Sequence, residues 1–546
     1  MIEDQKTGRF CLINVLDVPI GCYRVFRPEH RFLLKLFDGV SVRKLAKIAR
    51  RRIDEIKDIV MTLDRELYFQ NIPSPSGSSK RFLSTSDAVR NHFETLFENE
   101  SNKHEKDGKP WSIYGKNPRI PTLHVYAHLT NLCNLSCAYC FTAANERNDN
   151  SLSIPVNMPR ETIEKMLKSF CALIRHRHGA GRLNLVLFGG EPTLKGELRY
   201  TLYWTAERAC EICHENRVFL HMIIISNGTQ VNDELLEFVG KYGIGVTLSV
   251  DLPLEVQDQV RHFCNGKGSG AEIKNAIKLL NKYKVNFVTR TTVTKLNQSR
   301  LIEAMDYTKS IGLHSINAIP VDNISQPNDI VQPPDSEVLC EEYLKAWRYG
   351  IELFRSANYS MKITPVNVLL KRIAEGGGKF NAGCGMGVAL VSVSTNGEVH
   401  SCFKVRTPEY RLANVYDSNF VKKMESVTKQ QKSHTFDDLF FTSSDPVLEK
   451  LANKNVFLCS KCNVLIFCGG GCVARSFWAF GTKKIGNGLF QDSFQLGPQR
   501  CEETRKLFTT MFWDYIDLSP EDKAKFEYYQ KFAKIQPSFW SSPIIS

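Results

Sequence analysis

The sequence predicts an α/β fold in which six strands of one parallel sheet form an open sheet or a partial (β/α)6 barrel. Strand-length apolar runs alternate with amphipathic helical stretches such as ETIEKMLKSFCALI and EIKNAIKLLNKY. Parallel strands need crossover connections, and this alternation supplies them. Ligand-binding residues are therefore expected at the C-terminal ends of the strands. The expected strands are LHVYAHLT, LNLVLFGG, HMIIISNG, IGVTLSV, NFVTRTTVT and SINAIPV.

Size and composition are those of a globular protein with several domains. The chain has 546 residues, of which 42% are hydrophobic and 24% are charged. A prior of about 150 residues per domain gives three or four domains, and such a composition can bury a sizeable core. The formal net charge of +13 favours an acidic partner without choosing among nucleic acid, an anionic membrane and an acidic peptide.

No segment reads as a secretion signal or a membrane span. The N-terminal residues MIEDQKTGRF are polar, and no apolar run approaches the ~18 residues of a membrane helix. The chain is therefore expected to be cytoplasmic, without a membrane partner. Thiols stay reduced in that compartment, so the 17 cysteines favour metal or cluster ligation over disulfides.

Three cysteines follow the first expected strand, in the sequence Cys133-Asn-Leu-Ser-Cys137-Ala-Tyr-Cys140. Three thiolates at this spacing can bind one 4Fe–4S cubane and leave one iron without a protein ligand. Three buried cysteines, or three zinc ligands awaiting a fourth, are alternatives, but free cysteines rarely cluster in this way. The motif predicts an iron–sulfur cluster at the end of the first strand.

The spacing C-x3-C-x2-C, with an aromatic residue before the last cysteine, resembles the radical S-adenosylmethionine (SAM) superfamily. In that family the open iron chelates SAM, and an electron from the cluster splits SAM into methionine and a 5′-deoxyadenosyl radical that abstracts hydrogen. The resemblance implies a partial (β/α)6 radical SAM barrel, bound SAM and an electron donor such as flavodoxin or ferredoxin.

Polar segments at the other strand ends fit the same resemblance. The GGEP segment combines glycines that allow close backbone approach with a carboxylate that suits the SAM ammonium. Short polar side chains after the third and fourth strands can hold ribose hydroxyls, and an arginine suits the SAM carboxylate. Arg261 competes with Arg290 for that role, and Tyr139 is expected near the adenine. The expected SAM-binding residues are Tyr139, Gly189, Gly190, Glu191, Pro192, Ser226, Asn227, Ser249, Asp251 and Arg290.

Seven more cysteines follow the barrel, and their spacing resembles the SPASM extension of radical SAM enzymes. The resemblance implies two auxiliary 4Fe–4S clusters, three clusters in all; two structural zinc sites are the alternative. Fully ligated relatives carry an eighth cysteine shortly after the first, where this chain has GMGVAL. An open iron is therefore expected on the first auxiliary cluster, unless another ligand fills it. The implied ligands are Cys384, Cys402 and Cys472 for the first cluster, and Cys459, Cys462, Cys468 and Cys501 for the second.

The N-terminal block, residues 8–70, has two short apolar segments, Phe10–Val15 and Cys22–Phe26, followed by helix-like patterns. It resembles the winged-helix peptide-recognition module of peptide maturases, which binds a leader peptide as an added strand. A DNA-binding role is the alternative, because Arg50, Arg51 and Arg52 lie in a helix–turn–helix-like context. A structural cap is a third interpretation.

Together these modules resemble maturases of ribosomally made peptides. The expected reaction is oxidative modification of a precursor peptide bound through its leader, with thioether formation between a cysteine sulfur and a carbon as the leading product. An anaerobic sulfatase-maturase-like enzyme that makes formylglycine is the nearest rival. An iron–sulfur DNA-binding regulator is the rival from another class, although no nucleic-acid partner is expected. No general base is identified.

The domain boundaries expected from these patterns divide the chain into six parts. They are a winged-helix module at 1–85, a linker at 86–120, the radical SAM barrel at 121–330, a helical bridge at 331–380, a SPASM domain at 381–510 and a helical tail at 511–546.

Overall fold

The computed structural model describes most of the barrel region and parts of the segments on either side of it. The described residues are 2–3, 10–13, 23–26, 97–98, 101–102, 110–111, 121–140, 155–179, 181–321, 331–357, 359–374, 385–406, 408–426, 464 and 498–523.

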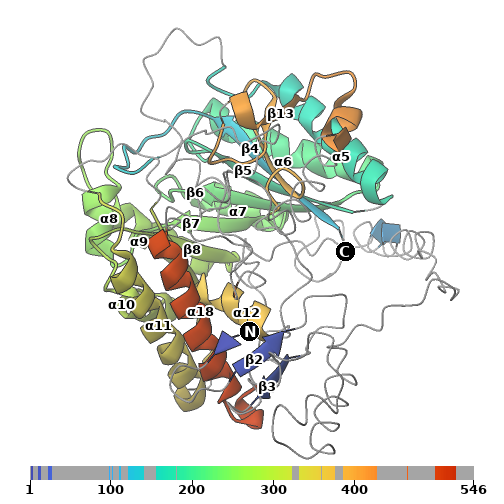
Figure 1. Ribbon diagram of the computed structural model, residues 1–546. Helices are drawn as coiled ribbons and strands as arrows, with labels where there is room; N and C mark the ends of the chain where they lie inside the picture. The colour runs from blue at the N-terminus through green and yellow to red at the C-terminus, as the bar shows by residue number, and fades with distance from the viewer. Residues whose placement is uncertain are drawn as a thin grey trace, which may run out of the picture.

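Within these residues a mixed sheet of ten strands forms the centre of the molecule (Figure 1). The strand order is β10-β9-β8-β7-β6-β5-β4-β11-β12-β13. From β4 to β9, each strand pairs in parallel with the next along the chain, which confirms the six parallel strands expected from the sequence. Their bounds are β4 Thr122–Thr130, β5 Arg182–Gly189, β6 Phe219–Ser226, β7 Gly245–Ser249, β8 Phe287–Val293 and β9 Ser315–Pro320.

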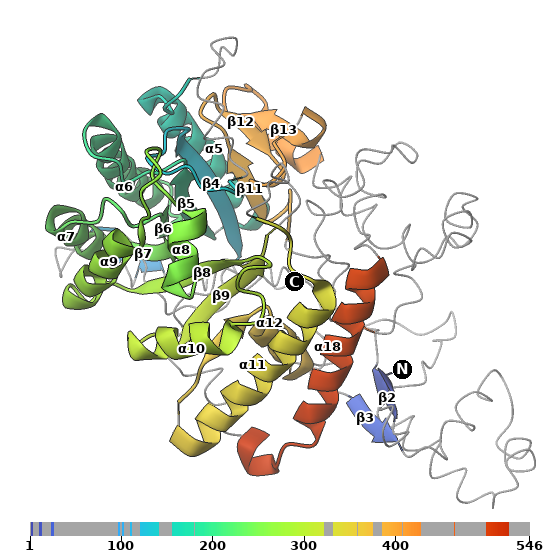
Figure 2. The ribbon, with the colours of Figure 1, turned by 90° about the vertical axis from the view of Figure 1, so that its left-hand side faces the viewer.

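Helices connect these strands, as the amphipathic stretches predicted. In Figure 2, α6, α7 and α9 lie together on one side of the strands. A right-handed crossover between parallel neighbours places successive helices on the same face of a sheet. The connecting helices are α5 Arg160–His178, α6 Glu197–Glu215, α7 Asp233–Lys241, α8 Leu254–Val260, α9 Gly270–Lys282 and α10 Leu301–Ser310.

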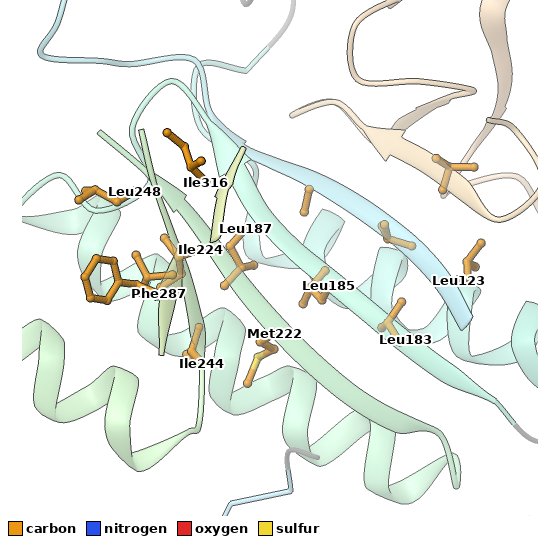
Figure 3. Packing of buried hydrophobic residues seen from close by; sticks show 14 of the residues in the cluster. Leu123, Leu183, Leu185, Leu187, Met222, Ile224, Ile244, Leu248, Phe287 and Ile316 are labelled. Carbon is orange, nitrogen blue, oxygen red and sulfur yellow. The ribbon is translucent and has the colours of Figure 1, made fainter. Parts of the chain in front are cut away.

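The strands are apolar on both faces because both faces are covered. Leu183, Leu185 and Leu187 on β5 belong to the main core between sheet and helices (Figure 3). Val186 and Phe188, the alternate residues, belong to a second apolar cluster on the opposite face. Successive side chains of a strand point to opposite faces, so a parallel strand covered on both sides reads as a continuous apolar run.

The sheet extends beyond the six expected strands at both edges. β10 Lys362–Thr364 pairs in parallel with β9, and β11 Leu390–Val393 pairs in parallel with β4. β12 Glu398–His400 and β13 Arg411–Asn414 continue the sheet in antiparallel pairing. Residues expected in a helical bridge and in a separate cysteine-rich domain therefore contribute strands to the barrel sheet.

The remaining helices pack beside β10. α11 Ser336–Ala357 and α18 Pro498–Ile516 lie side by side in Figures 1 and 2, and the Trp347 indole donates to Asp514 across them at 3.2 Å. The short α12 Val366–Ala374 follows β10, and a 3-10 turn at Pro408–Tyr410 precedes β13. None of the described helices is long and apolar enough to cross a membrane.

The N-terminal region contains a small antiparallel sheet. β1 Ile2–Glu3 pairs with β2 Phe10–Ile13, which pairs with β3 Tyr23–Phe26. β2 and β3 therefore lie within the two apolar segments of the N-terminal block. The helix-like patterns of the expected winged-helix module lie outside the described residues.

Candidate functional site

The cysteine motif forms a loop directly after β4, and the end of α8 with the residues that follow it holds this loop in place. Ser136 donates its backbone N–H to the His262 carbonyl at 2.8 Å, and Ala138 donates to the Val260 carbonyl at 3.0 Å. These two bonds fix the loop between its cysteines. The three cysteines line a cavity together with residues from the C-terminal ends of the strands.

A cavity of about 140 Å³ opens between this loop and the strand ends. Residues from the cysteine loop and from the ends of β5 through β9 reach it, and Lys404 reaches it from the chain after β12. Of the residues expected from the sequence, those lining it are Cys133, Cys137, Tyr139, Cys140, Gly189, Gly190, Glu191, Ser226, Asn227, Ser249 and Arg290. Asp251 and Pro192 do not line it.

The two glycines after β5 allow the cysteine loop to pack against that strand. A Cβ on Gly189, whose φ is +147°, would lie 2.3 Å from the Thr130 carbonyl oxygen, and one on Gly190 would lie 2.0 Å from that of Leu132. Gly190 and Glu191 donate their backbone N–H groups to these same carbonyls. The sequence assigned these glycines to ligand approach; in the structure it is the protein's own backbone that approaches them most closely.

Glu191 is buried and holds the ends of β5 and β6 together. Its Oε1 accepts hydrogen bonds from the Thr193 backbone and hydroxyl and from Ser226 Oγ, and its Oε2 accepts from the Asn227 backbone at 2.6 Å. Burial raises the pKa of this carboxyl, whereas the four donors oppose that shift. Since Oε1 already accepts three hydrogen bonds, Oε2 is the oxygen available to a cation in the cavity.

Asn227 links the end of β6 to the cysteine loop. Its side-chain amide donates to Asn134 Oδ1 at 2.9 Å and lies 3.8 Å from Cys133 Sγ. Its own Oδ1 accepts from the backbone and hydroxyl of Thr229. The orientation of the amide is therefore fixed at both ends.

Asp251 was expected from the sequence to contact the ribose of SAM, but its carboxylate contacts protein groups instead. The residue follows β7 and is fully buried, and its carboxylate accepts from the Tyr139 hydroxyl, from Arg261 Nε at 3.0 Å and from the Thr292 backbone at 2.7 Å. Burial raises the pKa of the Tyr139 phenol well above its usual value, so the hydroxyl stays a donor. The carboxylate is occupied by protein groups and does not reach the cavity, whereas Ser249 does.

Three cationic side chains line the cavity. Arg290 comes from β8, Arg261 from the end of α8, and Lys404 from the chain after β12. Arg261 is already paired with Asp251. The pattern of positive charge suits an anionic group such as a carboxylate at this end of the sheet.

The described residues include only part of the second cysteine set. Cys402 is buried two residues before Lys404, whose backbone N–H donates to its sulfur at 3.4 Å. Cys501 lies in α18, and its side chain is outside the described residues. Cys384, Cys459, Cys462, Cys468 and Cys472 also lie outside them.

The other helical cysteines are buried in the core. Cys210 and Cys213 lie on α6, and Cys213 Sγ lies 3.7 Å from Cys171 Sγ on α5. Burial raises the pKa of Cys210 to about 12. These placements suit a structural role in the core.

The cysteine loop suits an iron–sulfur cluster. Its three thiols line one cavity, and burial raises the pKa of Cys137 to about 12, so a metal must displace a proton to bind there. Among the described residues no three His, Cys, Asp or Glu side chains converge on a single ion. The ligands of a cubane each bind a different iron, so they need not converge.

Several residues of the site were not expected from the sequence. Thr193 and Gln257 support Glu191 and Asp251 by hydrogen bonds, and Lys404 enters from a distant segment. Thr193 directly follows the GGEP segment, so its position in the sequence could have identified it as a residue of the site. Lys404 has no such signal, because its segment reaches the barrel through contacts between residues far apart in sequence, such as the pairing of β11 with β4 and the stacking of Phe403 on Tyr126.

The sequence model of the Radical SAM superfamily matches residues 128–308 of this chain. A cysteine-type anaerobic sulfatase-maturating enzyme of Clostridium perfringens is 25% identical over 348 residues, which are 62% of this chain and 85% of that enzyme. The antilisterial bacteriocin subtilosin biosynthesis protein AlbA of Bacillus subtilis is 22% identical over 306 residues, 56% of this chain and 60% of AlbA.

A solved structure shares the fold. Native anSMEcpe with bound AdoMet superposes with a TM-score of 0.55 at 20% identity, and the match covers 72% of this chain and 98% of that one.

Proposed function

Residues 128–308 of this chain are a radical SAM domain, and on that premise we propose that the chain is a SAM-cleaving enzyme that oxidatively modifies a peptide or protein side chain. The observation that carries the proposal is the single cavity lined by all three cysteines of the β4 loop and by the ends of the parallel strands. The radical SAM family implies a 4Fe–4S cluster and SAM, and its relatives here modify proteins or peptides.

In this proposal Cys133, Cys137 and Cys140 hold the cluster. When bound, the cluster supplies the electron that generates a 5′-deoxyadenosyl radical from SAM. Glu191 Oε2 accepts from the SAM ammonium, and Arg290 binds the SAM carboxylate as a bidentate partner. The Ser249 hydroxyl is directed to the ribose, and Tyr139 flanks the adenine.

The leading reaction is a thioether cross-link in a ribosomally made precursor peptide. One hydrogen atom leaves a substrate carbon with the deoxyadenosyl radical, the cysteine thiol loses a proton, and one electron leaves to an acceptor as the C–S bond forms. The product is lighter by two hydrogen atoms. Two auxiliary clusters held by the second cysteine set are suitable acceptors, because such clusters change oxidation state by one electron.

A second candidate is formylglycine formation, which the similarity to sulfatase-maturating enzymes favours. That reaction oxidises the cysteine Cβ by two electrons, with one hydrogen atom passing to the deoxyadenosyl radical and one electron and one proton leaving the substrate. Water then supplies the aldehyde oxygen and the sulfur leaves as hydrogen sulfide, so the product gains an aldehyde and loses sulfur. Mass spectrometry of a modified cysteine-containing peptide separates the two products. Reaction with an aldehyde-specific hydrazide identifies formylglycine alone.

The experiment that tests the shared chemistry is a SAM-cleavage assay on the reduced protein. The parent chain is expected to release 5′-deoxyadenosine. A variant with alanine at Cys133, Cys137 and Cys140 is expected to release none and to lose about four of about twelve irons, if three cubanes are present. The matched control replaces the core cysteines Cys171, Cys210 and Cys213. This variant is expected to have the iron content and the SAM-cleavage activity of the parent chain. Retained cleavage in the first variant would overturn the proposal.

A further inference from the structure

One buried carboxylate joins three segments that surround the cavity. Asp251 follows β7 and is fully buried. Its Oδ2 accepts from the Tyr139 hydroxyl of the cysteine loop and from Arg261 Nε at 3.0 Å, and its Oδ1 accepts from the Thr292 backbone of β8 at 2.7 Å. The cysteine loop, the end of α8 and the end of β8 therefore share one anchor.

The position of the Arg261 side chain is fixed by this anchor. While Nε donates to Asp251, one terminal nitrogen lies 4.0 Å from Cys137 Sγ. The guanidinium carbon lies 5.2 Å from the centre of the Tyr139 ring, within cation–π range. The charge of Arg261 is thereby directed at the middle cysteine of the loop.

A second layer of hydrogen bonds closes the network behind Asp251. Its backbone N–H donates to Gln257 Oε1 at 2.8 Å, and Gln257 Nε2 donates to Ser269 Oγ at 2.8 Å. The Ser269 hydroxyl donates to the carbonyl of Arg261. Gln257 and Ser269 are fully buried, so both partners of the ion pair are held by groups shielded from solvent.

Simple stabilisation of the fold does not account well for this arrangement. Burying an ion pair carries a desolvation cost, and an apolar replacement of similar volume is often as stable. A ribose contact does not account for it either, because Asp251 does not line the cavity. What distinguishes the pair is its place against Cys137.

We propose that Asp251 is a positioning residue for the SAM-cleaving cluster, acting through Tyr139 to order the cysteine loop and through Arg261 to place a positive charge against Cys137. The inference rests on the proposed binding of the cluster by Cys133, Cys137 and Cys140. Groups that orient metal ligands control metal retention, and hydrogen bonds and charge at the ligand sulfurs set the reduction potential of a cluster.

The first test measures retention of iron in the full chain. Asp251→Asn removes the charge with little change in shape, and Tyr139→Phe removes only the hydroxyl. Each is expected to speed the loss of the SAM-responsive cluster to a chelator by about 10- to 100-fold, the usual effect of losing an outer-shell partner. The remaining iron should be lost at the parent rate, which shows that the chain is still folded.

The matched control is Asp258→Asn. Asp258 is an exposed carboxylate on α8, and its Oδ1 accepts from the Gly270 backbone at 2.6 Å. The substitution makes the same charge change three residues before Arg261. Its chelation rate is expected to match the parent.

The second test measures the midpoint potential of the cluster whose electron paramagnetic resonance signal responds to SAM. A positive charge stabilises the reduced, more negative cluster, so Arg261→Gln is expected to shift this potential to a more negative value. Arg261→Lys keeps the charge and is expected to stay nearer the parent. A purely structural role for Arg261 would not move the potential of a cluster that is still bound.

The outcomes separate this inference from the proposed function. If the parent chain holds no SAM-responsive cluster, the proposed function fails. If the parent holds one, but Asp251→Asn and Tyr139→Phe release it at the rate of Asp258→Asn, the positioning role fails alone. An unchanged potential in Arg261→Gln would likewise overturn the part assigned to Arg261.

Discussion

The side-chain amide of Asn227 at the end of β6 lies 3.8 Å from Cys133 Sγ at the start of the cysteine loop. The same nitrogen donates to Asn134 Oδ1 at 2.9 Å. A residue expected from the sequence to face the ribose thus also contacts the cysteine loop. One amide therefore links the end of β6 to the cysteine loop.

Removing this amide should weaken cluster binding. Asn227→Ala deletes the donor to Cys133 and Asn134, so we expect the SAM-responsive cluster to be released to a chelator about tenfold faster. Iron release followed by absorbance is the measurement. Asn216→Ala is the matched control, because Asn216 Nδ2 caps α6 through the Ile212 carbonyl, away from the cysteine loop. Equal release rates in the two variants would show that the Asn227 amide does not support the cluster.

A methyl group at Gly190 should disturb the junction of the cysteine loop and β5. The added Cβ would lie 2.0 Å from the Leu132 carbonyl oxygen, so the loop must shift at a cost of about 1–3 kcal/mol. We expect a lower thermal midpoint and a reduced iron content in Gly190→Ala. Gly240→Ala in α7 has open space around the new methyl group and should be neutral or slightly stabilising. A Gly190→Ala protein as stable and iron-rich as the parent would contradict the packing role of the glycine.

Affinity for SAM should depend on Arg290. Loss of a charge-assisted hydrogen bond in Arg290→Gln is expected to raise the SAM dissociation constant by about 10- to 100-fold, with the iron content unchanged. Equilibrium binding of SAM to the holoenzyme measures this. Arg208→Gln, which removes an arginine paired with Glu164 and Glu211 on the outer face of α5 and α6, is the control. If Arg261→Gln weakens binding and Arg290→Gln does not, the SAM carboxylate lies at Arg261.

The sequence was sufficient for the parallel core of the fold and for many of the residues that line the cavity. Several of the six strands are largely apolar, such as β6 with every residue buried, and the alternation of strands with helices leaves few topologies. The cysteine spacing located the loop after β4. These features are local in sequence, which is why they could be read without a structure.

Long-range pairing could not be read in the same way. β11 and β10 are only four and three residues long, and no local pattern shows that they join β4 and β9. The contacts of Asp251 could not be predicted for a related reason. An aspartate directly after a strand is suited to accept hydrogen bonds from ribose hydroxyls. Only the fold shows that the Tyr139 hydroxyl and Arg261 donate to the Asp251 carboxylate instead.

A row of polar side chains across β4, β5 and β6, buried at Asn184 and His221 and half-buried at His124, should make the fold sensitive to acid. Asn184 lies between two histidines: its Nδ2 donates to His124 Nδ1 at 2.7 Å, and its Oδ1 accepts from His221 Nδ1 at 2.8 Å. Burial and the nearby charge of Arg182 lower the pKa of both His124 and His221 to about 4. A histidine whose pKa is lowered in the folded state contributes stability above its unfolded pKa of about 6.5, and this stability is lost as the pH falls toward 4.

We therefore expect the thermal midpoint to fall between pH 6.5 and pH 4 more steeply than one surface histidine would cause. His221→Gln keeps a donor for Asn184 Oδ1 but cannot take up a proton, so its midpoint should fall less over this range. His314→Gln changes an exposed histidine that contacts the Ser360 carbonyl and serves as the control, with a slope like that of the parent. Calorimetry of the three proteins from pH 7 to pH 4 provides the comparison. Identical slopes in the parent and His221→Gln would mean that protonation of His221 does not limit stability in acid.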